Sequence, residues 1–374
     1  MKRLSAIMLA AFMLLITPAR ADTTAAPEIS AKAAIVIHAD TREPIYELNA
    51  DARMLIASTT KIMTALVVLE NCALDETVEV DSRSAGKEGS SMYLRAGEEY
   101  TVEELLYGLM LASGNDAASA LAIHVAGSEE DFAELMNEKA EELGMEDSHF
   151  QNPHGLDAEG HYSTARDMAM LAAYAMENED FERIVSSRSA SVHGVSIYNH
   201  NRLLSEYPGC IGVKTGYTMA AGRTLVSCAE RDGTRFICVT LCDCDDWRDH
   251  SNLYDWAFEN YEYRELLSSE TQFHVAAVNS GEPYAQVCAP EGAYALLERG
   301  AEVDVRLELP PFVIAPVRAG ETAGRVVYTS GGETVCEAPL VYADDIEIAN
   351  SPGLFGSIAE WFRGLGRPIY LTGD

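Results

Sequence analysis

Basic residues are scarce in this 374-residue chain, which carries 27 lysines and arginines against 59 aspartates and glutamates and a formal net charge of −32. A surface with so few cations repels the phosphates of nucleic acid and of anionic lipid. We therefore expect no nucleic-acid partner. The excess of carboxylates indicates a well-hydrated, soluble surface.

Long apolar runs are absent after the first 21 residues, because no later stretch reaches the roughly 18 apolar residues of a membrane-spanning helix. The start itself, MKRLSAIMLAAFMLLITPARA, combines basic residues, an apolar run and a small-residue end at Ala19-Arg20-Ala21. This pattern is typical of a secretory signal peptide. We expect residues 1–21 to be removed. The mature protein would then act outside the cytoplasm, on the outer face of the cytoplasmic membrane or in the periplasm or cell-wall space.

The eight cysteines follow no familiar disulfide framework, and a chain of this length does not need one. The segment LCDCDDW, residues 241–247, lacks the second ligand pair and the neighbouring histidines of a zinc site. At this segment we therefore expect buried free thiols at a strand end rather than a metal site, and we expect no cofactor.

The order of the expected elements indicates an α+β catalytic domain over residues 22–271. Two strands surround the turn DTREP, residues 40–44, and a series of helical patterns occupies the middle of the chain. One of these helices should begin with a capping box formed by Thr101 and Glu104. Strand-like segments dominate from Val192, before a last helix that ends near Tyr263. Such an order predicts an antiparallel sheet covered by helices.

The remaining chain differs in texture. Residues 272–349 contain short strand-like runs separated by glycine and proline, which predicts a small all-β domain. Residues 350–374 form an amphipathic tail. Either this tail is a helix packed on its own protein, or it lies in the plane of a membrane surface; we favour the membrane. Its apolar face consists of Leu354, Phe355, Ile358, Trp361, Phe362 and Leu365.

One helix start combines a hydroxyl with an amine. In LIASTTKIMTALVVLE, residues 55–70, Ser58 precedes Lys61 by three positions, so both side chains share one face of the helix. A buried lysine with a lowered pKa can remove the proton of a serine hydroxyl. The spacing alone is a weak signal, because Ser84 and Lys87 share it in a loop, where we expect Lys87 to be solvated.

Two further motifs support Ser58. Ser113-Gly114-Asn115 follows an apolar helix, and Lys214-Thr215-Gly216 lies on an expected strand. Taken singly, the first would be a pair of helix caps and the second an exposed strand lysine before a turn. The coincidence of all three motifs, in this order and on helix, loop and strand, favours a catalytic set.

This set resembles the serine acyl-transferase motifs of penicillin-binding proteins and β-lactamases. The chain is identified as a member of the D-alanyl-D-alanine carboxypeptidases, which are low-molecular-mass penicillin-binding proteins. The resemblance covers nearly the whole mature chain and implies the penicillin-binding transpeptidase fold. It rests on the segments ASTTKIMTAL, SSMYLRAGEEYTVEELLYGLMLASGNDAASALA, FQNPHGLDAEGHYSTARDMA, NHNRLL and GVKTGYTMAAGRTLVS.

The resemblance implies roles for nine residues. Ser58 would attack the D-Ala-D-Ala carbonyl of a peptidoglycan stem peptide, Lys61 would accept its proton, and Ser113 would relay a proton to the departing amine. The other six would bind the substrate. Asn115 would bond to the substrate backbone, and the terminal carboxylate would be held by Lys214, Thr215 and Arg248. The N–H of Tyr217 would stabilise the oxyanion, and Gly216 would allow the substrate to approach the strand. Arg248 is equally well explained as a surface arginine in an acidic turn. His154, His161 and His200 are interpreted as structural.

The same motifs leave more than one activity open. The resemblance implies a carboxypeptidase that trims the terminal D-alanine and is inhibited covalently by β-lactams. A D,D-endopeptidase would share every motif. A β-lactamase is disfavoured because the chain lacks a Glu-x-x-Leu-Asn stretch for activating the deacylating water and has an extra β domain. A non-catalytic wall-binding module is disfavoured because it would not need Ser58, Lys61, Ser113 and Lys214 together.

Overall fold

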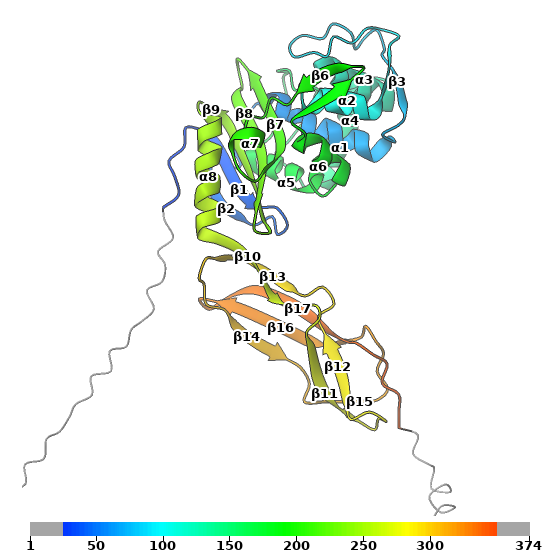
Figure 1. The fold of residues 1–374 in the computed structure, drawn as a ribbon, viewed down its shortest axis with the longest axis vertical. Helices are drawn as coiled ribbons and strands as arrows, with labels where there is room; N and C mark the ends of the chain where they lie inside the picture. The colour runs from blue at the N-terminus through cyan, green and yellow to red at the C-terminus, as the bar shows by residue number, and fades with distance from the viewer. Residues whose placement is uncertain (1–24, 350–374) are drawn as a thin grey trace, which may run out of the picture. The chain divides into compact units, whose positions relative to one another are not determined.

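The computed structural model describes residues 25–349. Contacts within the chain divide these residues into two units (Figure 1). The first unit contains the residues up to 262 together with 298–300, and the second contains 263–297 and the residues from 301 onward. No helix among residues 25–349 is long and apolar enough to cross a membrane.

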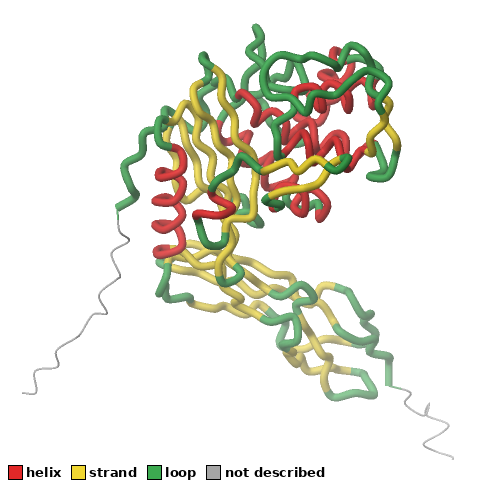
Figure 2. Tube along the Cα trace, turned by 45° about the horizontal axis from the view of Figure 1, so that its top comes forward, coloured by secondary structure: helices red, strands yellow, loops and turns green. Residues whose placement is uncertain are grey.

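An antiparallel sheet of five strands, in the order β2-β1-β9-β8-β7, forms the centre of the first unit. Every residue of β1 is buried, which explains its unbroken apolar sequence, because both faces of the sheet are covered. Helix α8 (Asp246–Asn260) covers one face, where the short α7 (Leu203–Glu206) lies beside it, and α5 (Ala165–Ala175) packs on the opposite face with the main group of helices (Figures 1 and 2). The strands are β1 (Ala33–His38), β2 (Pro44–Leu48), β7 (Cys210–Thr218), β8 (Gly222–Arg231) and β9 (Thr234–Asp243).

The helices follow the local signals of the sequence. The capping box of Thr101 and Glu104 is present at the start of α2, and glycine at position 127 ends α3 in the left-handed conformation. The helices are η1 (Ala57–Thr60), α1 (Lys61–Asn71), α2 (Val102–Met110), α3 (Asn115–Ala126), α4 (Glu129–Glu142), α5 (Ala165–Ala175), α6 (Glu179–Ser186), α7 (Leu203–Glu206) and α8 (Asp246–Asn260). Two small hairpins pair β3 (Thr77–Glu79) with β4 (Glu99–Thr101) and β5 (Ser189–Val192) with β6 (Val195–Tyr198).

The second unit is built from strands alone among its described residues. Strand β10 (Tyr261–Leu267) pairs with β13 (Ala293–Glu298), and a six-stranded sheet has the order β14-β16-β17-β12-β11-β15. Its strands are β11 (Gln272–Val278), β12 (Tyr284–Cys288), β14 (Asp304–Glu308), β15 (Phe312–Ile314), β16 (Thr322–Ser330) and β17 (Glu333–Tyr342). The predicted fold class, an antiparallel sheet with helices followed by an all-β domain, is confirmed.

The boundary between the units differs from the sequence-based expectation. The second unit begins at Tyr263, within β10, rather than at residue 272. The chain leaves α8 directly as a strand, and the partner of that strand, β13, lies about 30 residues further on. The signal peptide and the amphipathic tail, residues 1–21 and 350–374, lie outside the described residues.

Candidate active site

Ser58 and Lys61 lie at the start of the first long helix. The backbone reaches them through Ala57, which adopts a left-handed φ of 47°, an uncommon conformation for a residue with a side chain. Ser58 follows in the short turn η1, where the first backbone N–H groups have no partner within the helix. Lys61 opens α1 and is fully buried. Its Nζ lies 2.9 Å from Ser58 Oγ.

The surroundings of Lys61 favour an uncharged amine. Burial lowers its pKa well below the ordinary value of 10.5, and the charge of Lys214 lowers it further, whereas the carboxylate of Asp116 raises it. Nζ also donates to Asn115 Oδ1 at 2.7 Å and to the His154 carbonyl at 2.6 Å. A neutral amine has two N–H groups and one lone pair. If the two oxygens accept both hydrogens, the lone pair is directed at the hydroxyl of Ser58.

The Ser113-Gly114-Asn115 motif forms the turn between α2 and α3. Ser113 is buried and has a left-handed φ of 59°, and Asn115 begins α3. The amide of Asn115 links two parts of the site, because its Oδ1 accepts from Lys61 while its Nδ2 donates to the Glu88 carbonyl at 2.6 Å. Asn115 therefore ties the loop around residue 88 to Lys61.

The next residue, Asp116, fixes the same loop and was not singled out in the sequence. Its buried carboxylate accepts from Ser91 Oγ at 2.6 Å and from the backbone N–H groups of Met92 and Leu94 at 2.9 and 3.0 Å. Such a carboxylate supplies acceptors for loop amides that would otherwise be unpaired. The feature of the sequence that could have indicated Asp116 is its position directly after Asn115.

Strand β7 provides the opposite wall. Lys214 is buried, and its Nζ donates to the Thr215 carbonyl at 2.9 Å. Burial lowers the pKa of Lys214 to about 7. Thr215 is half-buried, and Tyr217 is 66% exposed, so its ring stands free of the core.

Gly216 brings the strand against the helix start. A Cβ at this position would lie 2.9 Å from Ser58 N and 2.4 Å from Thr224 Oγ1, closer than real side chains approach. The missing side chain is thus required by contact with the turn that carries Ser58. The approach of substrate to the strand at Gly216 stays a prediction.

Within the described chain, the contacts of Arg248 are made with its own helix turn and not with the other predicted residues. It lies in the first turn of α8 and forms ion pairs with Asp245 at 2.8 Å and Asp249 at 3.3 Å. Its side chain is 60% exposed. The interpretation as an arginine in an acidic turn describes these contacts fully.

A second loop, residues 152–161, supports the site from behind. His154 supplies the carbonyl that accepts from Lys61, and the His161 Nε2 lies 2.8 Å from Thr60 Oγ1. Burial lowers the pKa of His161 to about 4, so its ring is neutral. Gly155 adopts a left-handed φ of 83°, and a Cβ there would lie 1.9 Å from the Ala57 carbonyl. Two of the three histidines expected to be structural, His154 and His161, are therefore in contact with the turn that carries Ser58 and Lys61.

Burial lowers the pKa of His200, and the charge of Lys214 lowers it further. Its interpretation as a structural residue stays a prediction. Lys87, in contrast, corrects an expectation. It is not freely solvated, because its Nζ lies 2.5 Å from Glu129 Oε1 with only 26% of the side chain exposed.

Metal-ligating side chains gather away from the nine predicted residues. The donor atoms of Cys72, Glu76 and His124 lie within 4.8 Å of one another, and His124 Nε2 is 2.9 Å from Glu76 Oε1. An ordinary ion pair accounts for that contact. All eight cysteines are free thiols.

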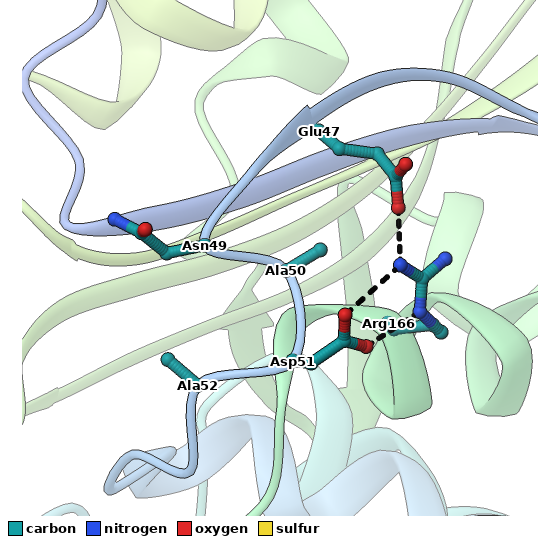
Figure 3. A pocket seen from close by; sticks show the side chains of 6 residues that line it. All are labelled: Glu47, Asn49, Ala50, Asp51, Ala52 and Arg166. Carbon is teal, nitrogen blue, oxygen red and sulfur yellow. Dashed lines mark hydrogen bonds and ion pairs between the residues drawn. The ribbon is translucent and has the colours of Figure 1, made fainter.

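A pocket at the edge of the sheet also contains none of the nine. Glu47 and Asp51 converge there on Arg166 (Figure 3), which already pairs with both carboxylates. The charged groups of this pocket are thus satisfied by one another, and the chemistry of the molecule concentrates around Ser58.

The arrangement as a whole fits acyl transfer. A hydroxyl and a buried amine are in contact, the charge of a second buried lysine lowers the pKa of the first, and the N–H of Ser58 lies at a helix start without a side-chain cap. These are the parts of an activated serine nucleophile with a site for a developing negative charge.

Comparison with known proteins identifies relatives of both units. The family model described as D-alanyl-D-alanine carboxypeptidase matches residues 20–244, and that of the C-terminal domain of penicillin-binding protein 5 matches residues 261–348. The chain is 34% identical to the D-alanyl-D-alanine carboxypeptidase DacF of Bacillus subtilis, over 93% of this chain and 96% of that protein. It is 32% identical to DacC of Escherichia coli, over 93% and 92% of the two chains.

Solved structures agree with this assignment. Penicillin-binding protein 5 of Haemophilus influenzae superposes with a TM-score of 0.75 at 28% identity, covering 86% of this chain and 99% of that one. The PBP3 of Streptococcus pneumoniae, titled a peptidoglycan synthesis regulatory factor, superposes with a TM-score of 0.74 at 26% identity and covers 86% and 100%. The likeness therefore extends over both units.

Proposed function

Because the chain belongs to the D-alanyl-D-alanine carboxypeptidase family of serine peptidases, we propose that it removes the terminal D-alanine from peptidoglycan stem pentapeptides through an acyl-enzyme on Ser58. The observation that carries this proposal is the contact of 2.9 Å between Ser58 Oγ and the fully buried amine of Lys61. The neutral amine is a base that a solvated lysine could not be.

In the first step, Lys61 Nζ takes the hydroxyl proton while Ser58 Oγ bonds to the carbonyl carbon of the penultimate D-alanine. The carbonyl oxygen becomes an oxyanion, which the N–H groups of Ser58 and Tyr217 would stabilise. Such a donor is typically worth about 10²–10³ in rate. Protonated Lys214, with Thr215, would hold the terminal carboxylate that defines a carboxypeptidase substrate.

In the second step, the peptide bond breaks and D-alanine leaves with the proton that Lys61 had taken, which Ser113 relays to its nitrogen, so that Lys61 is neutral again. The acyl group stays on Ser58 until water attacks it. Lys61 would accept a proton from that water, and collapse of the intermediate returns the proton to Ser58 and releases the shortened peptide. A β-lactam would enter the first step in the same way, but its amine stays tethered to the acyl group, so the acyl-enzyme would persist.

Labelling by a fluorescent penicillin tests the nucleophile. We expect the mature protein to be labelled and Ser58→Ala not to be. Ser84→Ala is the matched control, because Ser84 shares the spacing to a lysine but lies in the loop before β4, and its label should persist. Labelling that survives in Ser58→Ala would place the nucleophile elsewhere.

Release of D-alanine tests the reaction. We expect the protein to liberate D-alanine from a stem pentapeptide faster than it cleaves a cross-linked peptide dimer. The reverse preference would identify a D,D-endopeptidase, the alternative that shares the motifs. We also propose that residues 1–21 direct secretion and that residues 350–374 associate with the membrane surface.

A further inference from the structure

The carboxylate of Glu129 connects three separate segments behind the candidate active site. Glu129 is the first residue of α4, and its side chain is only 18% exposed. It accepts a hydrogen bond from Ser119 Oγ on α3, lies 2.5 Å from Lys87 Nζ in the loop before β4, and lies 3.6 Å from His154 Nε2.

Each of the three segments also supplies a contact to the catalytic set. The residue after Lys87 is Glu88, whose carbonyl accepts from Asn115 Nδ2. Ser119 lies one helical turn after Asn115 on α3. His154 supplies the carbonyl that accepts from Lys61. Glu129 thus holds together the three segments that place acceptors around Lys61 Nζ and Asn115.

The protonation states fit this arrangement. His154 Nδ1 accepts from the N–H of Leu156 at 3.2 Å, and burial lowers the pKa of the imidazole. The neutral ring therefore carries its proton on Nε2, the nitrogen that faces Glu129. Burial on its own would raise the pKa of Glu129, but the donors of His154, Lys87 and Ser119 outweigh it and hold this pKa at about 2. The carboxylate stays charged with its donors in place.

We propose that Glu129 is a positioning residue for acyl transfer, acting with Lys87 and His154. Its carboxylate fixes the loop of His154 and the loop of Lys87 so that the two oxygens around Lys61 accept its N–H groups and leave its lone pair aimed at Ser58. When one oxygen moves away, the amine rotates and the proton transfer from Ser58 is misaligned. This inference rests on the proposed function, since it concerns the same site.

The test compares Glu129→Gln and Glu129→Ala with Glu130→Gln. Glu130 is the neighbouring residue and is exposed, and its charge acts on Arg83 outside the candidate site, so Glu130→Gln removes an equal charge from the same helical turn. The second-order rate of acylation by a fluorescent penicillin is measured for each. We expect a loss of about 10- to 100-fold for Glu129→Ala, the scale of a misplacement of order 1 Å, with Glu130→Gln close to wild type.

A pH profile separates positioning from mere loss of folded protein. The charged and titratable groups that face Lys61 are Lys214 and Asp116, and those that face Glu129 are Lys87 and His154. The charges of these groups therefore influence the pH profile. Removing the carboxylate and loosening the acceptors both disfavour the charged form of Lys61. The acid limb of the acylation profile should therefore move to lower pH while the plateau falls. Protein that is folded but inactive, or lost from the sample, would lower the plateau and leave the midpoint of the acid limb unchanged.

Lys87 provides a second variant that leaves the helix intact. Lys87→Met should reproduce the loss, and Lys87→Arg should restore most of the rate because a guanidinium can still pair with Glu129. If wild type takes the label, and Glu129→Ala and Lys87→Met are acylated as fast as Glu130→Gln, the positioning role is overturned and the proposed function is not. A wild-type chain that neither takes the label nor releases D-alanine would overturn the proposed function and this inference together.

Discussion

Two lysines account for much of the chemistry at the scale of single residues. Lys61 and Lys214 are both buried, and burial is the largest cause of the lowered pKa of each. The proposed function asks opposite things of them, since Lys61 must be a base and Lys214 must carry charge to meet a carboxylate. A substrate carboxylate beside Lys214 would raise its pKa again and supply the charge on binding.

Replacing Lys214 should change how stability depends on pH. The folded-state pKa is about 7 against an ordinary 10.5, so between these values the unfolded chain binds the extra proton, and stability rises with pH by up to about 1.4 kcal/mol per unit. Below pH 7 the full cost of the buried charge is present. Lys214→Met should therefore be more stable than wild type at pH 6, with an advantage that shrinks toward pH 10.

Urea denaturation at pH 6, 8 and 10 measures this difference. The control is Lys32→Met, at an exposed position, which should follow the wild-type dependence. A constant difference between Lys214→Met and wild type across the three pH values would mean that Lys214 keeps its proton in the folded protein.

The sequence could predict some residue contacts of the site and not others. The three-residue spacing of Ser58 and Lys61 on a helix was enough to place them together. The partners of Glu129 lie 10 to 42 positions away, at Ser119, His154 and Lys87, and no local pattern links them. Lys87 was for this reason expected in solvent. Its ion pair exists only because the fold brings α4 beside that loop.

Close approach of strand and helix defines the site at the scale of elements. Strand β7 packs against η1 because Gly216 has no side chain, and Thr224 Oγ1 on β8 donates to the Ile56 carbonyl at 3.0 Å just before the turn. The sheet thus sets the distance between Ser58 and the wall formed by Lys214 and Thr215. A small change in this packing acts directly on the geometry of the nucleophile.

Gly216→Ala should separate the two elements. The new Cβ would meet Ser58 N and Thr224 Oγ1, so β7 or the turn must shift, and we expect penicillin acylation to fall by about 100-fold or more. The control is Gly281→Ala in the second unit, where a Cβ would meet no atom within 4 Å. Acylation of Gly216→Ala at the wild-type rate would show that strand and turn can move apart without cost.

Local signals predicted most elements, and long-range pairing decided the rest. The strands around DTREP and the capping box before α2 follow from neighbouring residues, and both occur as expected. Strand β10 was missed because it continues from α8 without a break and depends on pairing with β13. The unit boundary fell at Tyr263 instead of residue 272 for the same reason.

Acidity constrains how the whole molecule can meet a membrane. With a formal net charge of −32, the chain gains nothing from anionic lipid. In the proposed anchor, Arg363 and Arg367 are offset by Glu360 and Asp374, so binding would depend on the apolar side chains of the tail. Neutral vesicles should therefore bind the protein at least as well as anionic ones.

Deleting residues 350–374 tests this anchor. We expect the mature chain to sediment with phosphatidylcholine vesicles and the chain ending at Ala349 to stay in the supernatant, because the deletion removes the apolar face that contains Phe355, Trp361 and Phe362. Trp361→Glu in the full chain should weaken binding, whereas Glu360→Gln, a neighbouring change on a polar residue, should not. The truncated chain should release D-alanine from a soluble pentapeptide at the full rate, since all nine candidate residues lie in the first unit. Sedimentation of the truncated chain, or binding that requires anionic lipid, would contradict an anchor based on apolar area.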